Sequence, residues 1–188
     1  GGNFDLSYRK GKISFANKFS LDYNKAENPI VPFSEFSRAN PYYRKTDENG
    51  KIERYLDHFV IPNTNTTYSV GNPLWNASLN NLDEEDQFSF RNNLNLEWRI
   101  MSSLYLRGRL GIGKGVKKTE KFVSPQHSSF DNYTQDKKGR YTSTTVSEFY
   151  YDGDLTLTYG ALLREVHQVN AVLGTNLRSS LSTSEGYT

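Results

Sequence analysis

The strongest constraint on the fold is a long stretch of alternating apolar and polar residues between Phe88 and Ile112. Two runs carry an apolar side chain at nearly every second position, the first at Phe88, Phe90, Leu94, Leu96 and Trp98, the second at Leu104, Leu106, Leu110 and Ile112. A short break at residues 100–103 separates them. Because successive side chains leave opposite faces of a strand, this period predicts two β-strands joined as a hairpin.

The length of the runs narrows the choice of architecture. Strands of globular sheets have about 5–6 residues, whereas a tilted strand needs about 9–11 residues to cross a bilayer. The positions between the apolar residues are predicted to face a water-filled lumen, and they include Arg91, Asn93, Asn95, Glu97, Arg99, Arg107 and Arg109. In a transmembrane β-barrel the apolar face meets lipid and the polar face lines a wet interior. A soluble β-sandwich gives a similar alternation, so the hairpin alone leaves both architectures open.

Composition excludes several functional classes. Tyrosine and phenylalanine are abundant, at 13 and 11 of 188 residues, which favours β structure. The net charge is only +2 and no basic stripe stands out, so nucleic acid is not an expected partner. There is no cysteine, which excludes disulfide scaffolds, cysteine nucleophiles and thiolate metal sites. No apolar run approaches the length of a transmembrane helix, which leaves a strand-built membrane protein open.

The same alternation recurs on both sides of the central hairpin. We predict strands near residues 3–9, 12–23, 88–99, 104–115, 146–159 and 166–178. Short turns at 9–12, 100–103 and 160–165 join them in pairs, and long loops at 24–87 and 117–145 join one pair to the next. In an antiparallel meander all the short turns then lie at one end and the long loops at the other, as in outer-membrane barrels.

The predicted fold is therefore all-β, an antiparallel meander of long hairpins that forms a segment of a transmembrane β-barrel with long extracellular loops. The chain opens directly on strand-like sequence and stops without a terminating feature, so we expect both ends to be cuts through a larger protein. Within the first long loop, residues 34–38 are predicted to form a short helical turn.

Seven short sequence motifs are specific when they are taken together. They are residues 8–13 (YRKGKI), 39–45 (ANPYYRK), 72–77 (NPLWNA), 90–93 (FRNN), 107–111 (RGRLG), 151–159 (YDGDLTLTY) and 167–170 (HQVN). In this order, spread along nearly the whole chain, they resemble the SusC-like TonB-dependent outer-membrane transporters. The resemblance covers a middle part of the family's barrel; the TonB box and the plug domain have no counterpart in these residues.

The resemblance implies a function and a set of partners. Members of the family import oligosaccharides, and in some cases peptides, across the outer membrane. They work with a SusD-like surface lipoprotein as a lid, and they take energy from the TonB complex through an N-terminal region that is missing here. The resemblance thus implies part of an active transporter located in the outer membrane, with a glycan or peptide as substrate.

Aromatic residues of the first long loop are candidates for contact with a substrate or with the lid protein. The group consists of Phe33, Phe36, Tyr42, Tyr43 and Trp75, of which the last three flank prolines. Aromatic rings offer a broad apolar surface, and tyrosine and tryptophan add a polar handle. The alternative is that these rings form a small satellite core that holds the loop together.

Other motifs carry no chemistry that we predict. The acidic run at residues 83–86 lacks the spacing of a calcium loop and is better explained as a solvated charge run at a strand entrance. Residues 111–115 (GIGKG) lack the ending and the helix of a phosphate loop. The three histidines share no metal-ligand spacing, and no catalytic triad is apparent, so we predict no enzyme, cofactor or metal. A soluble carbohydrate-binding β-sandwich and a surface adhesion module remain alternatives to the transporter.

Overall fold

The structure is a computed structural model that describes residues 1–64, 66–164 and 166–188. The chain divides into two compact units, which are described separately. Unit 1 comprises Gly1–Lys25, Asp86–Lys118 and Thr145–Glu185, and unit 2 comprises Ala26–Glu85, Thr119–Thr144 and Gly186–Thr188.

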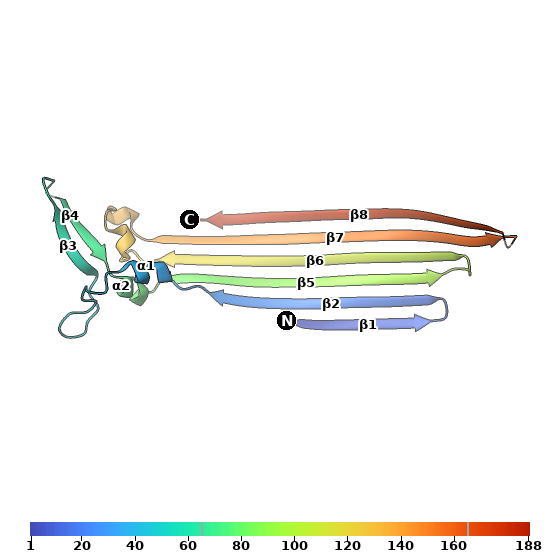
Figure 1. Cartoon of the computed structure of the whole chain (residues 1–188), viewed down its shortest axis with the longest axis horizontal. Coiled ribbons are helices and arrows are strands. Elements are labelled where there is room, and N and C mark those ends of the chain that lie inside the picture. Colours follow the sequence, from blue (N-terminus) through green and yellow to red (C-terminus); the bar gives the residue numbers. More distant parts are fainter. Residues whose placement is uncertain (65, 165) are drawn as a thin grey trace. The chain divides into compact units, whose positions relative to one another are not determined.

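Unit 1 is built on a six-stranded antiparallel sheet. Its strands are β1 (Gly2–Lys10), β2 (Ile13–Glu27), β5 (Leu82–Arg99), β6 (Leu104–Val123), β7 (Arg140–Leu163) and β8 (His167–Tyr187). They lie in the order β1-β2-β5-β6-β7-β8, so each strand pairs with the next one of the sheet along the chain (Figure 1). The predicted all-β antiparallel meander of long hairpins is confirmed.

Several strands are longer than the alternation predicts. β5 begins at Leu82 rather than near residue 88, and β8 reaches Tyr187 rather than ending near residue 178. The acidic run is thus part of a strand, and its backbone takes part in pairing, since Asn28 N–H donates to the Asp83 carbonyl at 2.8 Å. Ladder hydrogen bonds use the backbone, so a strand continues through polar residues after the apolar period has ended.

Two of the three predicted short turns, at 9–12 and 100–103, close hairpins in the structure. Gly11 takes a positive φ of 57° between β1 and β2, where a residue without a side chain is least strained. The β5–β6 turn is closed by a hydrogen bond from Ile100 N–H to the Leu104 carbonyl at 3.0 Å. The third turn, predicted at 160–165, is wrong for residues 160–163, because β7 extends to Leu163. Glu165 lies outside the described residues.

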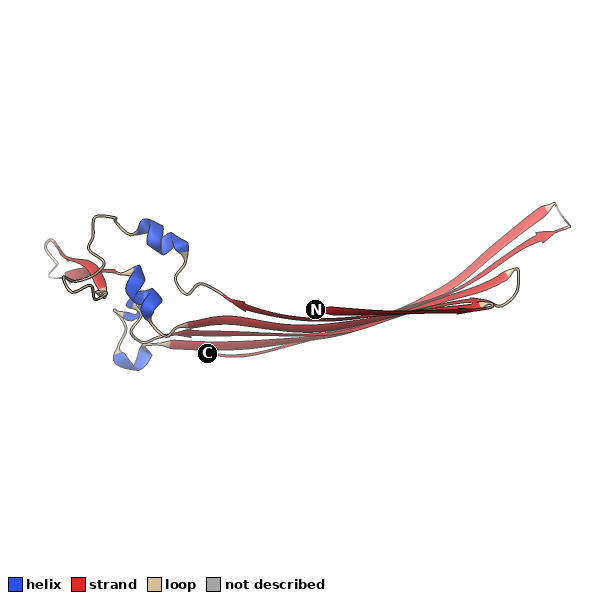
Figure 2. Cartoon of the chain, turned by 90° about the horizontal axis from the view of Figure 1, so that it is seen from below, coloured by secondary structure: helices blue, strands red, loops and turns tan. Residues whose placement is uncertain are grey.

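The register between β1 and β2 separates two faces of the sheet. Phe4 lies opposite Phe19 and Tyr8 opposite Phe15 on one face. The alternate pairs carry polar side chains, for example Asp5 opposite Lys18 and Arg9 opposite Ser14, and they lie on the other face. We call these the apolar face and the polar face. Figure 2 shows the six strands as a single twisted layer.

Unit 2 has a small core of its own. It contains α1 (Phe33–Arg38), the hairpin of β3 (Tyr55–Ile61) and β4 (Thr66–Gly71), α2 (Pro73–Ser78), and two 3-10 turns at Ser128–Phe130 and Gln135–Lys137. The helical turn predicted at 34–38 is confirmed. Among the described residues, the buried apolar side chains are Val31, Pro73 and Phe130, all in unit 2. The sheet of unit 1 therefore has no apolar core in the part of the chain that the structure describes.

Candidate binding surfaces

The polar face of unit 1 carries two ion pairs between neighbouring strands. Arg109 on β6 donates through Nε to a carboxylate oxygen of Asp154 on β7 at 2.7 Å, and its Nη2 atom lies 2.6 Å from the same oxygen. Arg107, also on β6, lies 3.3 Å from Glu97 on β5. Opposite charges on adjacent strands stabilise their pairing and fix the direction of both side chains.

A groove of about 500 Å³ lies over these ion pairs. Its lining combines the charged side chains with neutral hydrogen-bonding groups from Ser14, Asn95 and Thr156. Four of the residues predicted to be lumen-facing, Asn95, Glu97, Arg107 and Arg109, are brought together here. The groove is chemically suited to a hydroxyl-rich ligand, because both donors and acceptors point away from the backbone of one sheet face.

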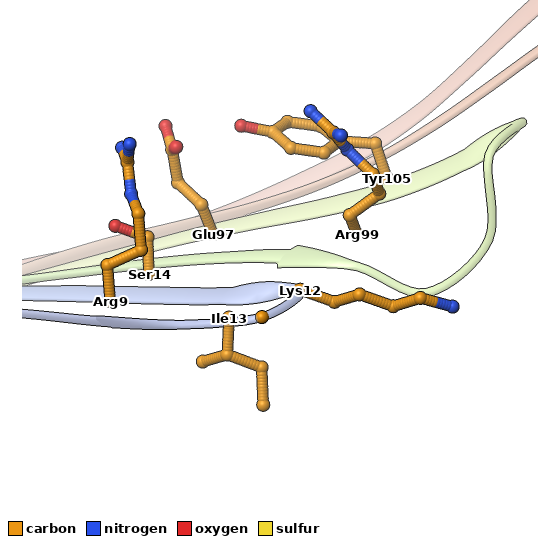
Figure 3. A pocket seen from close by; sticks show the side chains of 8 residues that line it. Arg9, Lys12, Ile13, Ser14, Glu97, Arg99 and Tyr105 are labelled. Atoms are coloured by element: carbon orange, nitrogen blue, oxygen red, sulfur yellow. The ribbon is translucent and has the colours of Figure 1, made fainter.

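A second hollow, of about 280 Å³, lies beside the first and shares Ser14 and Glu97 with it. Figure 3 shows the side chains of Arg9, Ser14, Glu97, Arg99 and Tyr105 rising on the same side of the sheet, while Ile13 points to the opposite side. Arginines at the ends of β1 and β5 are thus presented together near the short turns.

The polar face is also shaped by glycines in β6. A side chain at Gly113 would meet the ring of Tyr150 on β7, and one at Gly111 would meet the carboxylate of Asp152. Both glycines are buried. Tyr150 therefore covers the backbone of the neighbouring strand, which compensates for the side chain that a glycine lacks.

The apolar face is exposed along its length. Phe19 and Phe90 stack across β2 and β5 with ring centroids 6.5 Å apart. Even so, Trp98 is 41% exposed and Leu155 is 46% exposed. Apolar surface that continues across several strands marks a surface that contacts another apolar medium or a partner.

Two polar residues interrupt the apolar face, and they meet. Asn17 on β2 and Asn92 on β5 exchange two side-chain hydrogen bonds, each of 3.2 Å. Both amides are partly shielded from solvent. The two polar residues that interrupt the apolar period therefore hydrogen-bond each other, and neither amide is left without a partner.

In unit 2, buried asparagines hold the loop segments together. Asn72 is fully buried; it caps α2 by accepting from Leu74 N–H at 3.0 Å, and it donates to the carbonyls of Lys45 and Glu53 at 2.9 and 2.6 Å. Asn76, one turn later, exchanges two hydrogen bonds with Ser128, at 2.8 and 3.1 Å. The NPLWNA stretch thus builds a capped helix whose two asparagines bind three separate segments of unit 2.

Unit 2 also contains a charged cluster. Arg54 pairs with Asp131, and its guanidinium lies over the ring of Tyr55 at 5.3 Å. The Nε atom of Arg54 is buried without a hydrogen-bond partner among the described residues. Burial, together with a hydrogen bond to Asp131, raises the pKa of Tyr55. The phenol therefore stays protonated and serves as a donor, and the cluster fastens the 128–131 turn to β3.

A third hollow, of about 510 Å³, opens between α1, β4 and the turn that begins after His127. Arg38, Tyr68 and His127 line it. The Nδ1 atom of His127 accepts from Ser129 N–H at 3.2 Å, and burial lowers the pKa of the imidazole below its ordinary value despite the opposing influence of Glu35 and Asp131. His127 is therefore a neutral acceptor that caps the turn.

The aromatic candidates of the first loop fall into two groups. Phe33 and Tyr42 are 82% and 93% exposed and are free to meet a partner. Phe36 is at the border of exposure, and Tyr43 is half-buried. Trp75 is half-buried, and its indole N–H donates to the Gln126 carbonyl at 3.3 Å, so its ring also helps to join α2 to the second loop. Their role in binding stays a prediction.

The acidic run of residues 83–86 is engaged within each unit. The Asp83 carboxylate accepts from Lys121 Nζ at 2.8 Å and from Asn28 at 3.0 Å, and these hydrogen bonds lower the pKa of Asp83. Asp86 accepts from the Tyr23 hydroxyl at 3.2 Å. Among the described residues, no group of three acidic, histidine or cysteine side chains has the arrangement of a metal site.

Sequence reasoning did not single out the partners that complete these surfaces. Asp154, Tyr150, Asn17, Asn92 and Asn72 were positions in a pattern, and only their neighbours across strands or loops reveal their roles. For Asn17 and Asn92 a signal existed, because each breaks an apolar period.

In the described part of the chain, no helix is long and apolar enough to span a membrane. No protein-family model and no curated protein sequence matches the chain.

Proposed function

We propose that the chain is part of a SusC-like TonB-dependent active transporter of the outer membrane. It would import oligosaccharides, or peptides, together with a SusD-like surface lipoprotein and with energy from the TonB complex. The sheet of unit 1 forms barrel wall in this proposal, with its apolar face toward lipid and its polar face toward the lumen. The single observation that carries the proposal is the exposure of large apolar side chains on all six strands of the meander, on one face of the sheet.

The dimensions of the apolar face support the membrane assignment. Aromatic residues of this face recur at residues 88 and 98 of β5 and at residues 149 and 159 of β7, in each case ten residues apart. At about 3.4 Å per residue this is about 34 Å of strand, which a tilt of about 45° reduces to about 24 Å. Outer-membrane barrels have an apolar band of about 25 Å between two aromatic girdles.

A soluble β-sandwich accounts for the same residues less well. It requires a second sheet to cover the apolar face of the first, at about 10 Å. Unit 1 contains one sheet among the described residues, and its apolar face has exposed residues from β1 to β8. A single exposed layer is not stable in water, since most stabilisation of a sheet comes from packing one face against something apolar.

The membrane assignment is tested by the alternation itself. Single cysteines replace Leu94 and Leu96 on the apolar face and, as matched controls, Asn93 and Asn95 on the polar face, in the whole protein that carries this sequence. Each is labelled with a fluorophore in lipid bilayers that contain brominated acyl chains. We expect strong quenching at residues 94 and 96 and weak quenching at 93 and 95. Equal quenching at all four positions contradicts the proposal.

Transport is tested in cells. Deletion of the gene is expected to abolish uptake of fluorescent oligosaccharides, and collapse of the proton gradient is expected to do the same in the wild type. Uptake that survives the loss of the gradient contradicts energy coupling through TonB.

A further inference from the structure

The hollow near the short turns has an uneven charge balance. Glu97 is the acidic side chain that lines it, against Arg9, Lys12 and Arg99. Glu97 is already paired with Arg107 at 3.3 Å, and the nearby Asp154 is paired with Arg109 at 2.6 Å. Both carboxylates in this region are therefore engaged by β6.

Arg9 and Arg99 have no carboxylate partner among the described residues. Lys12 is turned along the connection, where its Nζ donates to the Ile100 carbonyl at 3.2 Å. The two guanidiniums stand on the same side of the sheet (Figure 3). The Ser14 hydroxyl comes from β2, which lies between the strands that carry them, and the Tyr105 hydroxyl comes from β6, on the far side of β5. A guanidinium presents donors in a planar fork that matches the two oxygens of a carboxylate.

We propose that this hollow binds the carboxylate of an acidic sugar unit, and that the substrate is an anionic oligosaccharide. The inference rests on the proposed function, because it takes the polar face as the wall of the substrate path. The hollow has a volume of about 280 Å³, which suits one charged sugar unit rather than a long segment of the chain of sugars. The neighbouring groove, which shares Ser14 and Glu97 with it, offers neutral groups from Asn95 and Thr156 to the next sugar hydroxyls.

A sugar fits these surroundings better than an acidic peptide. Beside the arginines, the polar face carries the hydroxyls of Ser14 and Thr156, the amide of Asn95 and two ion pairs whose charges already neutralise each other. This arrangement matches a ligand with one charged group followed by a series of hydroxyls. The two hollows contribute few apolar side chains, so the apolar parts of a peptide would find little surface to pack against.

The test compares two oligosaccharides that differ only in charge. Binding of tetragalacturonate and of its methyl ester to the whole protein in detergent is measured by calorimetry at low salt. The variant Arg9→Gln with Arg99→Gln keeps hydrogen-bonding ability but removes two charges. The control variant, Lys10→Gln with Lys18→Gln, removes the same charge from β1 and β2 outside the hollow.

We expect the wild type to bind the acid about tenfold more tightly than the ester, with a preference that shrinks as salt is added. The preference disappears in the double arginine variant and persists in the lysine control. Equal binding of acid and ester, or a preference that survives loss of both arginines, overturns the inference while leaving glycan import in place. Binding of tetraglutamate as tight as that of the acid replaces the sugar with a peptide. A protein that binds neither oligosaccharide overturns the inference, whereas the import of glycans is judged separately by the uptake experiment.

Discussion

Asn17 and Asn92 hydrogen-bond each other in both directions on the apolar face of the sheet. Each amide donates through Nδ2 to the Oδ1 atom of the other at 3.2 Å. The flanking contact is the stack of Phe19 on Phe90, so the amide pair belongs to an otherwise apolar surface. On the lipid-facing surface that we propose, no water is at hand to replace a missing partner, and a reciprocal pair leaves each amide with one donor and one acceptor in use.

This pairing predicts a non-additive pair of substitutions. Asn92→Leu leaves the Asn17 amide unpaired and is expected to destabilise the protein by about 1–3 kcal/mol. Asn17→Leu has a similar effect for the same reason. The double variant replaces both amides with apolar groups and is expected to return close to the wild-type free energy of unfolding. Urea unfolding in lipid vesicles measures all four proteins, and additive losses in the double variant refute the reciprocal pair.

Asn72 gives a second prediction, this time in unit 2. Asn72→Ala removes the cap of α2 and leaves the carbonyls of Lys45 and Glu53 without their donor, so we expect a loss of about 2–3 kcal/mol. Asn72→Asp keeps the capping acceptor but places a carboxylate beside those two carbonyls, and it is expected to be no better tolerated. Asn49→Ala, at an exposed turn, is the control. Hydrogen exchange of the α2 amides reports the change locally; unaltered protection in Asn72→Ala contradicts the role.

The strands were predictable because their alternation follows directly from strand geometry. Phe88, Phe90 and Trp98 mark the apolar face in the sequence as they do in the sheet. The strand ends were not predictable in the same way. The part of β5 that precedes residue 88 consists largely of acidic residues, whose backbone forms the hydrogen bonds of the sheet as well as any other. Periodicity reports which face is apolar, and it is silent where both faces are polar.

The binding surfaces depend on register, which the sequence of one strand does not contain. The parity of Arg109 in the sequence places it on the polar face. Its contact with Asp154, however, depends on how β6 and β7 are aligned. The same holds for Tyr150 over Gly113. In the loops, prolines and a turn motif indicated breaks but not which segments Asn72 and Asn76 bring together.

The Arg109–Asp154 pair predicts a measurable coupling between two strands. Both side chains are substantially exposed, so we expect a coupling free energy of about 0.5–1 kcal/mol in a double-mutant cycle of Arg109→Gln and Asp154→Asn. The coupling should fall as salt rises from 0.05 to about 0.5 M, because a shorter Debye length screens exposed charges. Unfolding in detergent provides the four free energies. A coupling that is zero at low salt means that the pair does not stabilise the β6–β7 register.

His127 predicts a pH dependence of unit 2 that is separate from the titration of its carboxylates. Burial lowers the pKa of His127 below its ordinary value of 6.5, so near and below that pH the unfolded chain binds more protons than the folded one. The stability of unit 2 is therefore present at pH 7 and declines as the pH falls below about 6.5. The lowered pKa of Asp83 has a different window, since the stability it contributes is lost only as the pH falls below its ordinary value of 3.8.

Trp75 is a reporter for this effect, because its indole is hydrogen-bonded to the residue that precedes His127. In a Trp98→Phe background it is the only tryptophan of residues 1–188, and urea unfolding followed by its fluorescence isolates unit 2. We expect a lower midpoint at pH 5.5 than at pH 7.5 in this background. His127→Gln, which keeps an acceptor but cannot be protonated, should remove the difference, since glutamine has no charge to acquire. A midpoint difference of equal size in His127→Gln assigns the pH dependence to other groups and refutes the role of His127.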